Sequence, residues 1–182
     1  MWNKFIPIRI QKVYPNKKFC YLGQGESDIP ERFNELKSAN SDFIWLSFKE
    51  PVKDGIYLPT STWTQGRNNL YKYVLEKERI QGWNYNYYIF IDGDISIRYS
   101  DSNLNISGWR RFEQYLLKYN PAVASVSYTS IPFHDLPIQP KFGLKNEIGV
   151  QNHFDAILSS FHHEAAQVLL PYEETYDAES WW

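Results

Sequence analysis

Apolar residues in this chain form short runs that alternate with longer stretches in which they recur three and four positions apart. The short runs are bounded by glycine, proline or polar residues, and the run at 87–91 is apolar on both faces. Such a run suits a strand buried in a parallel sheet, where both faces are covered. The predicted strands are residues 19–22, 43–48, 56–58, 87–91 and 122–128.

Four stretches between these runs are predicted to be helical. The first begins after Asp28, whose side chain can cap it, with Pro30 in the first turn and Glu31 completing a capping box. The other three show apolar residues at helical spacing. They begin near Asn68, at Ser107 or Gly108 and at Phe154, and Pro171 ends the last one.

The alternation of strands and helices predicts the fold class. It indicates an α/β protein, a three-layer α/β/α sandwich around a mostly parallel sheet. At 182 residues the chain is expected to form one domain over 1–182. Ligands of such sheets bind beyond the carboxyl ends of the strands, so we expect the functional residues there.

Two carboxylates follow the central run directly. Asp92 and Asp94 are separated by Gly93, and in an extended segment residues two positions apart point to the same side. They can therefore converge on one hard cation such as Mg²⁺ or Mn²⁺. The alternative is a simple hairpin turn, because Asp-Gly stands between the apolar runs 87–91 and 95–97. That turn does not need Asp94, and both interpretations hold if the carboxylates lie on the turn.

A polar loop precedes the helix that leads into the central strand, and it contains Gly66, Arg67 and Asn68. The start of a helix presents free N–H groups to an anion, and Arg67 can add a charge-assisted bond to a phosphate. The alternative is a capped helix with a solvated arginine. Residues 23–25, Gly-Gln-Gly, read as a turn and match half of a dinucleotide-binding fingerprint, but the third glycine is missing.

An acidic pair lies close to the end of the given sequence. Asp177 and Glu179 are flanked by Tyr176, Trp181 and Trp182. A carboxylate beside large apolar groups can have a raised pKa and act as a base toward a hydroxyl. The alternative is an ordinary acidic surface loop. Because the sequence stops on two tryptophans with no polar tail, we expect the natural polypeptide to continue.

Three histidines and a glutamate raise the question of zinc: His153, His162, His163 and Glu164. At about 100° per residue, His163 lies opposite the apolar stripe of the predicted helix and His162 lies at its flank. The two side chains cannot face one ion together, so we do not expect zinc there.

Composition restricts the function classes. A formal net charge of -2 gives no basic surface, so we expect no nucleic-acid partner. Aromatic residues make up 18% of the chain, which suits sugar-binding faces as well as a large core or a partner interface. The single cysteine, Cys20, allows no internal disulfide and is expected to be buried in a strand. With no membrane-spanning window and no signal peptide, we expect a soluble domain, most simply a cytoplasmic one.

Taken together, these residues resemble the GT-A superfamily of nucleotide-sugar-dependent glycosyltransferases. The resemblance rests on the strand ending in Asp92-Gly93-Asp94, on the helix start Gly66-Arg67-Asn68 before it, and on the acidic motif Asp177-Ala178-Glu179 downstream. It implies a GT-A-like catalytic domain in which Asp92 and Asp94 hold Mn²⁺ or Mg²⁺ at the diphosphate of a nucleotide-sugar donor. Gly66, Arg67 and Asn68 are then expected at the donor.

The same resemblance gives the acidic motif a role at the acceptor. It implies Glu179, and after it Asp177, near the hydroxyl of a glycan or another acceptor. Many members supply a further metal ligand near the C-terminus, often a histidine, and none follows Glu179 in this sequence.

Two rival functions stay open. Phosphatases of the haloacid dehalogenase type also end an apolar strand in D-x-D, but they use their first strand and prefer Thr or Val where this chain has Ser96. A carbohydrate-binding or interaction module would use aromatic side chains as platforms and the aspartates as a turn or a structural calcium site. A covalent aspartyl phosphate would indicate the phosphatase, and sugar binding without a nucleotide would indicate the module.

Overall fold

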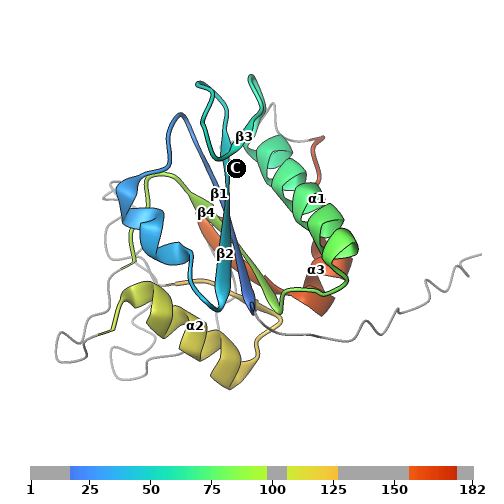
Figure 1. Cartoon of the computed structure of the whole chain (residues 1–182). Helices are drawn as coiled ribbons and strands as arrows, with labels where there is room; N and C mark the ends of the chain where they lie inside the picture. The colour runs from blue at the N-terminus through green and yellow to red at the C-terminus, as the bar shows by residue number, and fades with distance from the viewer. Residues whose placement is uncertain (1–16, 98–105, 127–155, 176–182) are drawn as a thin grey trace, which may run out of the picture.

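The computed structural model describes residues 17–97, 106–126 and 156–175. Within these residues the chain forms one six-stranded sheet with the order β3-β2-β1-β4-β6-β5 (Figure 1). The pairs among β1 to β4 are parallel, whereas β6 is antiparallel to β4 and to β5. The predicted α/β class with a mostly parallel sheet is confirmed. The strands are β1 (Phe19–Gly25), β2 (Ser41–Ser47), β3 (Ile56–Tyr57), β4 (Tyr87–Asp92), β5 (Val123–Ala124) and β6 (Leu158–His162).

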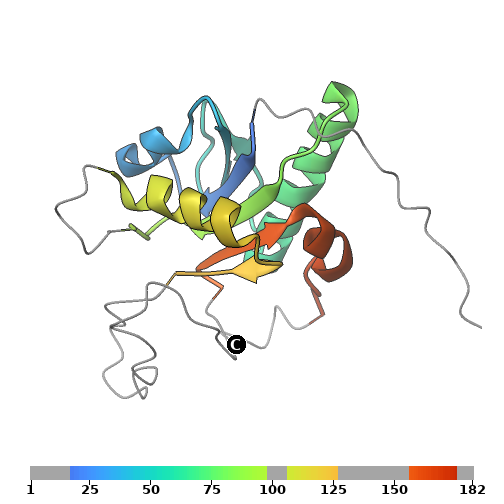
Figure 2. The same ribbon diagram turned by 90° about the horizontal axis from the view of Figure 1, so that it is seen from below.

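Helices pack on both faces of this sheet, as the two views show (Figures 1 and 2). Helices α1 (Trp63–Gln81) and α3 (His163–Leu169) lie on one face, and the 3₁₀ helix η1 (Glu31–Leu36) and α2 (Gly108–Tyr119) lie on the other. None of the helices in the described ranges is both long and apolar enough to cross a membrane.

The side chains of β1 alternate between the two halves of the core. Tyr21 packs with η1 and α2, and its ring meets that of Trp109 edge to face at 5.7 Å between centroids. Cys20 and Leu22 pack with α1 and α3 on the other face. Cys20 is buried, as predicted. Both faces of the central strands are therefore covered, which is why their sequences are apolar throughout.

Helix α1 begins more than one turn before the predicted start near Asn68. Thr62 is its N-cap, because the Thr62 side chain accepts a hydrogen bond from the Gln65 backbone while the Gln65 side chain accepts one from the Thr62 backbone. Gly82, with a φ of 74°, ends the helix in the left-handed conformation. Helix α2 is capped by Ser107 and stops at Asn120, as predicted.

The last predicted helix was wrong in its first part. Residues Leu158–His162 form strand β6, and only His163–Leu169 are helical, while Phe154 lies outside the described residues. β6 pairs with β4 on one side and β5 on the other, and Ser159 and Ser160 are fully buried within it. This pairing between distant segments outweighs the local three-four spacing that suggested a helix.

The structure also differs from the sequence interpretation in four smaller points. Asp28 caps no helix, since η1 follows Pro30 and has no side-chain cap. Residues 23–25 extend β1 instead of turning. Residues 95–97 form no strand, and β4 pairs with β1 and β6, so the hairpin alternative does not hold. Of the predicted strand at 122–128, only Val123–Ala124 is a strand within the described residues, which stop at 126.

Candidate functional site

The order of the strands reverses between β1 and β4. From β1 the chain builds outward through β2 and β3, and it then returns to place β4 on the other side of β1. Gln24 near the end of β1 is the register partner of Asp92 at the end of β4. Ligands of open α/β sheets bind outside the carboxyl ends of the strands at such a reversal. The predicted carboxylate Asp92 therefore lies where this fold favours a site.

Asp92 is held by two residues of α1. The Nη2 atom of Arg67 lies 2.8 Å from Oδ1 of Asp92, and Nε1 of Trp63 donates to the same oxygen at 3.1 Å. Burial raises the pKa of Asp92 above its ordinary range, and the charge and hydrogen bonds of Arg67 and Trp63 oppose that rise. The other oxygen, Oδ2, has a longer contact of 3.4 Å with Trp63. Oδ2 is thus the atom of Asp92 best able to accept a further ligand.

Arg67 is not the solvated side chain of the alternative prediction, because it is fully buried. Its guanidinium lies 3.9 Å from the ring centroid of Trp63 and donates to the Ser159 hydroxyl of β6 at 3.3 Å. Its Nε atom is buried and has no hydrogen-bond partner among the described residues. Arg67 therefore connects α1, β4 and β6 beneath the site, instead of standing at a helix start as predicted.

Asp94 lies in the turn after β4 and is exposed, in contrast to Asp92. The two carboxylates are close enough that the charge of Asp94 contributes to the raised pKa of Asp92. The backbone of this turn is fixed by Arg32 of η1, which donates from Nε to the Ile95 carbonyl at 2.9 Å and from Nη2 to the Gly93 carbonyl. Sequence reasoning missed Arg32, since no local pattern links η1 to a turn sixty residues later.

Three glycines near the site lie against the indole ring of Trp45. A Cβ atom on Gly23 or Gly25 would lie 2.7 or 2.6 Å from ring atoms of Trp45, and one on Gly93 would lie 3.0 Å away. Trp45 is fully buried in β2 and packs on the face opposite α1. The glycines that suggested half of a dinucleotide fingerprint therefore make room for an aromatic ring.

Gly66 and Asn68 both contact protein groups in this structure. A Cβ atom on Gly66 would lie 2.4 Å from the amide end of Gln24, so the missing side chain lets α1 approach β1. Asn68 binds the segment after α3, accepting from the Tyr172 N–H at 2.8 Å and donating to the Tyr172 carbonyl at 2.9 Å. It also donates to Glu174 at 2.7 Å. Of the predicted helix-start residues, only Arg67 contacts the carboxylate pair directly.

Asp177, Glu179 and His153 lie outside the described residues. The helical geometry predicted for the two histidines was wrong, because His162 ends β6 and His163 begins α3, and their ring centroids lie 4.3 Å apart. In the described part of the chain, no group of three or more His, Cys, Asp or Glu side chains is arranged to hold a metal ion. Among the described residues, a cation at this site would have Oδ2 of Asp92 and the carboxylate of Asp94 as its ligands.

A scan of protein-family models and searches of curated proteins and of solved structures found no match to this chain. Its function therefore has to be argued from the site itself.

Proposed function

We propose that this chain is the catalytic domain of a metal-dependent glycosyltransferase with a GT-A-like three-layer α/β/α sandwich. It moves a sugar from a nucleoside-diphosphate donor to the hydroxyl of a glycan or another acceptor. The observation that carries the proposal is the pair Asp92 and Asp94, at the carboxyl end of β4 beside the reversal of strand order. That edge of the sheet is where a nucleotide is expected to bind.

The two carboxylates match Mg²⁺ or Mn²⁺, which prefer oxygen ligands. A divalent ion bound there supplies a Lewis acid that stabilises the charge developing on the departing diphosphate. At an effective dielectric constant near 20, an attraction between unit charges about 4 Å apart is worth about 4 kcal/mol, or roughly three decades in rate.

Residues around the pair have supporting roles in this proposal. Arg67 and Trp63 hold one oxygen of Asp92 and favour its ionised form, which is the form that binds a cation. Arg32 fixes the backbone of the turn that carries Asp94. Glu179, or failing it Asp177, is the proposed base that accepts the proton of the acceptor hydroxyl.

Calorimetry of the full chain with a panel of nucleotide sugars, with and without Mn²⁺, tests this function. We expect Mn²⁺-dependent binding of one donor, and we expect Asp92→Asn and Asp94→Asn each to abolish it. Asp94→Asn changes an exposed side chain and should leave stability unchanged, whereas Asp92→Asn also removes the counter-charge of the buried Arg67 and should lower stability. Asp54→Asn is the matched control, because Asp54 is an exposed aspartate in another Asp-Gly turn. Equal affinity in both site variants and the control would contradict the proposal, and sugar binding without nucleotide or metal would favour the binding module.

A further inference from the structure

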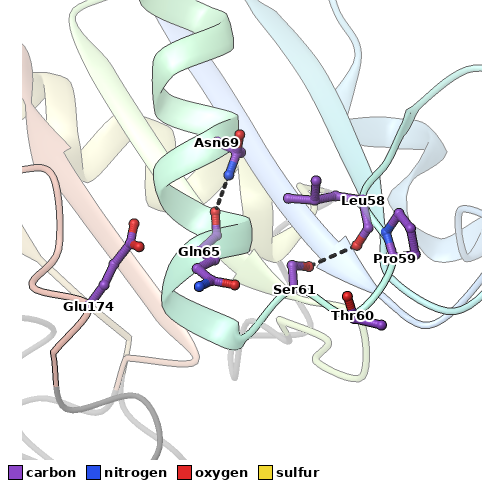
Figure 3. Close-up of a pocket in the computed structure, with 7 residues that line it drawn as sticks. All are labelled: Leu58, Pro59, Thr60, Ser61, Gln65, Asn69 and Glu174. Atoms are coloured by element: carbon purple, nitrogen blue, oxygen red, sulfur yellow. Dashed lines mark hydrogen bonds between the residues drawn. The ribbon is translucent and has the colours of Figure 1, made fainter.

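A concave surface lies at the first turns of α1, away from Asp92. It is an open depression of about 270 Å³, lined by seven residues of three segments (Figure 3). Gln65 and Asn69 of α1 form its floor, the loop from Leu58 to Ser61 forms one wall, and Glu174 stands at the other side. We call this surface the outer hollow.

The outer hollow is separate from the carboxylate pair. Residues of an α-helix are offset by about 100° each, so Gln65 and Asn69 lie roughly 200° around α1 from Trp63 and Arg67 respectively. Trp63 and Arg67 are the residues that contact Asp92. The helix itself therefore stands between the two sites.

The loop that forms the wall is held in a defined shape. Thr60 has a φ of 61°, which is an uncommon conformation for a residue with a side chain. The Ser61 hydroxyl donates to the Leu58 carbonyl at 3.0 Å across this turn. A strained residue fixed by its neighbours is typical of binding loops.

The floor and the far side of the outer hollow supply polar groups that can form further hydrogen bonds. The Gln65 side-chain oxygen accepts from the Thr62 backbone, and the Asn69 amide donates to the Gln65 carbonyl at 2.8 Å. The Gln65 amide N–H₂ and the Asn69 side-chain oxygen then have no partner among the described residues. The Glu174 carboxylate is oriented by Asn68 and can accept further hydrogen bonds. Donors and acceptors are thus mixed within one small surface.

The lining also restricts the chemistry of a ligand. It contains one carboxylate and no Lys, Arg or His, which disfavours a phosphate or another anion. Leu58 and Pro59 add an apolar patch beside the polar groups. A sugar ring has hydroxyl groups that both donate and accept, and it also has a C–H face that can lie on such a patch.

We propose that the outer hollow binds a neutral saccharide unit, independently of the nucleotide and of the metal. This site goes beyond the function proposed above, because a chain without transferase activity could also use it. In a transferase it would hold a part of the acceptor glycan remote from the reacting hydroxyl.

Titration of the ¹⁵N-labelled full chain with neutral oligosaccharides tests the proposal, with maltohexaose, cellohexaose and chitohexaose as probes at millimolar concentration. No nucleotide or metal is added. We expect one probe to shift the side-chain amide signals of Gln65 and Asn69. Asn69→Ala and Glu174→Gln should each weaken that binding about tenfold, since each removes a hydrogen bond, the second one to a charged group. Both changes are on exposed side chains, so the fold should survive.

Two control variants test whether the binding is specific to the outer hollow and independent of the carboxylate pair. Asn34→Ala removes an exposed amide on η1 and should leave the titration unchanged. Asp94→Asn should also leave it unchanged, because Asp94 is exposed and is not part of the lining of the outer hollow. A failure of the transferase proposal therefore does not affect this test. The proposal is overturned if no probe shifts the two amides, if binding persists undiminished in both hollow variants, or if Asp94→Asn abolishes it.

Discussion

The guanidinium of Arg67 is more deeply buried than the carboxylate of Asp92 with which it pairs. The two groups lie 2.8 Å apart, and their side chains are 1% and 20% exposed. Removing one partner of a buried ion pair leaves a charge without compensation, which costs more than the pair itself contributes. Asp92 is thus needed by the fold as well as by the proposed chemistry, and the two requirements can be separated experimentally.

Arg67→Met should destabilise the chain by about 3–5 kcal/mol, because it leaves Asp92 largely buried without a counter-charge. The double variant Arg67→Met with Asp92→Asn should recover part of that loss. Urea unfolding measures both, with Lys72→Met on the exposed side of α1 as the control. A double variant as unstable as the sum of the two single variants would show that the pair is not coupled.

Arg32→Ala should leave stability within about 1 kcal/mol, because Arg32 is exposed. It should nevertheless weaken Mn²⁺-dependent donor binding about tenfold, since the turn carrying Asp94 loses its bonds to Arg32. Calorimetry of donor binding and urea unfolding together separate these effects. Arg79→Ala is the control, because the exposed Arg79 pairs with the exposed Glu76 on the surface of α1. Unchanged donor affinity in Arg32→Ala would show that Arg32 does not contribute to the site.

Gly25→Ala should destabilise the fold by about 1–3 kcal/mol, because the added methyl would lie 2.6 Å from the Trp45 ring. The same change combined with Trp45→Phe should cost less than the sum of the single changes, since the smaller ring leaves space. Thermal or urea unfolding of the four proteins gives the coupling. If the two stability effects are strictly additive, the Trp45 ring is not what requires glycine at position 25.

Glu78 should make stability depend on pH near neutrality. It is 3% exposed at the end of α1 and accepts hydrogen bonds from the Tyr88 hydroxyl and the Tyr85 N–H, both at 2.8 Å. Burial raises its pKa from an ordinary value of 4.5 to about 7, although these bonds and Lys77 oppose the rise. The folded protein therefore holds this proton more tightly than the unfolded chain does, and its contribution to stability is lost as pH rises from 4.5 to about 7.

Urea unfolding of Glu78→Gln across that pH range checks the assignment. The variant should lack the loss of stability that the native protein shows over this range. Its stability relative to that of the native protein should therefore increase toward pH 8. Glu76→Gln, an exposed position on the same helix, should follow the native curve. An identical pH dependence in Glu78→Gln and the native protein would rule Glu78 out as the titrating group.

The central strand and the location of Asp92 could be predicted from the sequence because both depend on a local run of apolar residues. The early start of α1 could also have been found, since Thr62 and Gln65 form a capping-box signature in the sequence. With that start, both Trp63 and Arg67 would have been predicted to lie in the helix. Because they are four residues apart, they would then lie on one side of it.

Other features depend on contacts between distant segments, and no local pattern reveals them. Leu158 and Phe161 fit a helical stripe as well as a strand, and only pairing with β4 decides between the two. Arg32 reaches the Gly93 carbonyl from an exposed position in η1, so its sequence neighbours give no sign of its role. The roles of Gly23 and Gly25 became clear only with Trp45 beside them.

The contact of Trp45 with these glycines limits how far the strand ends at the candidate site can move. Its buried ring supports the ends of β1 and β4 from below, so the two strand ends cannot shift independently without opening a void. In the proposed function, adjustment to different ligands would then have to come from side chains beside Asp92, such as Trp63, which donates to it, and Gln24, its register partner on β1. Variants of these two residues are accordingly the ones in which to look for altered ligand preference.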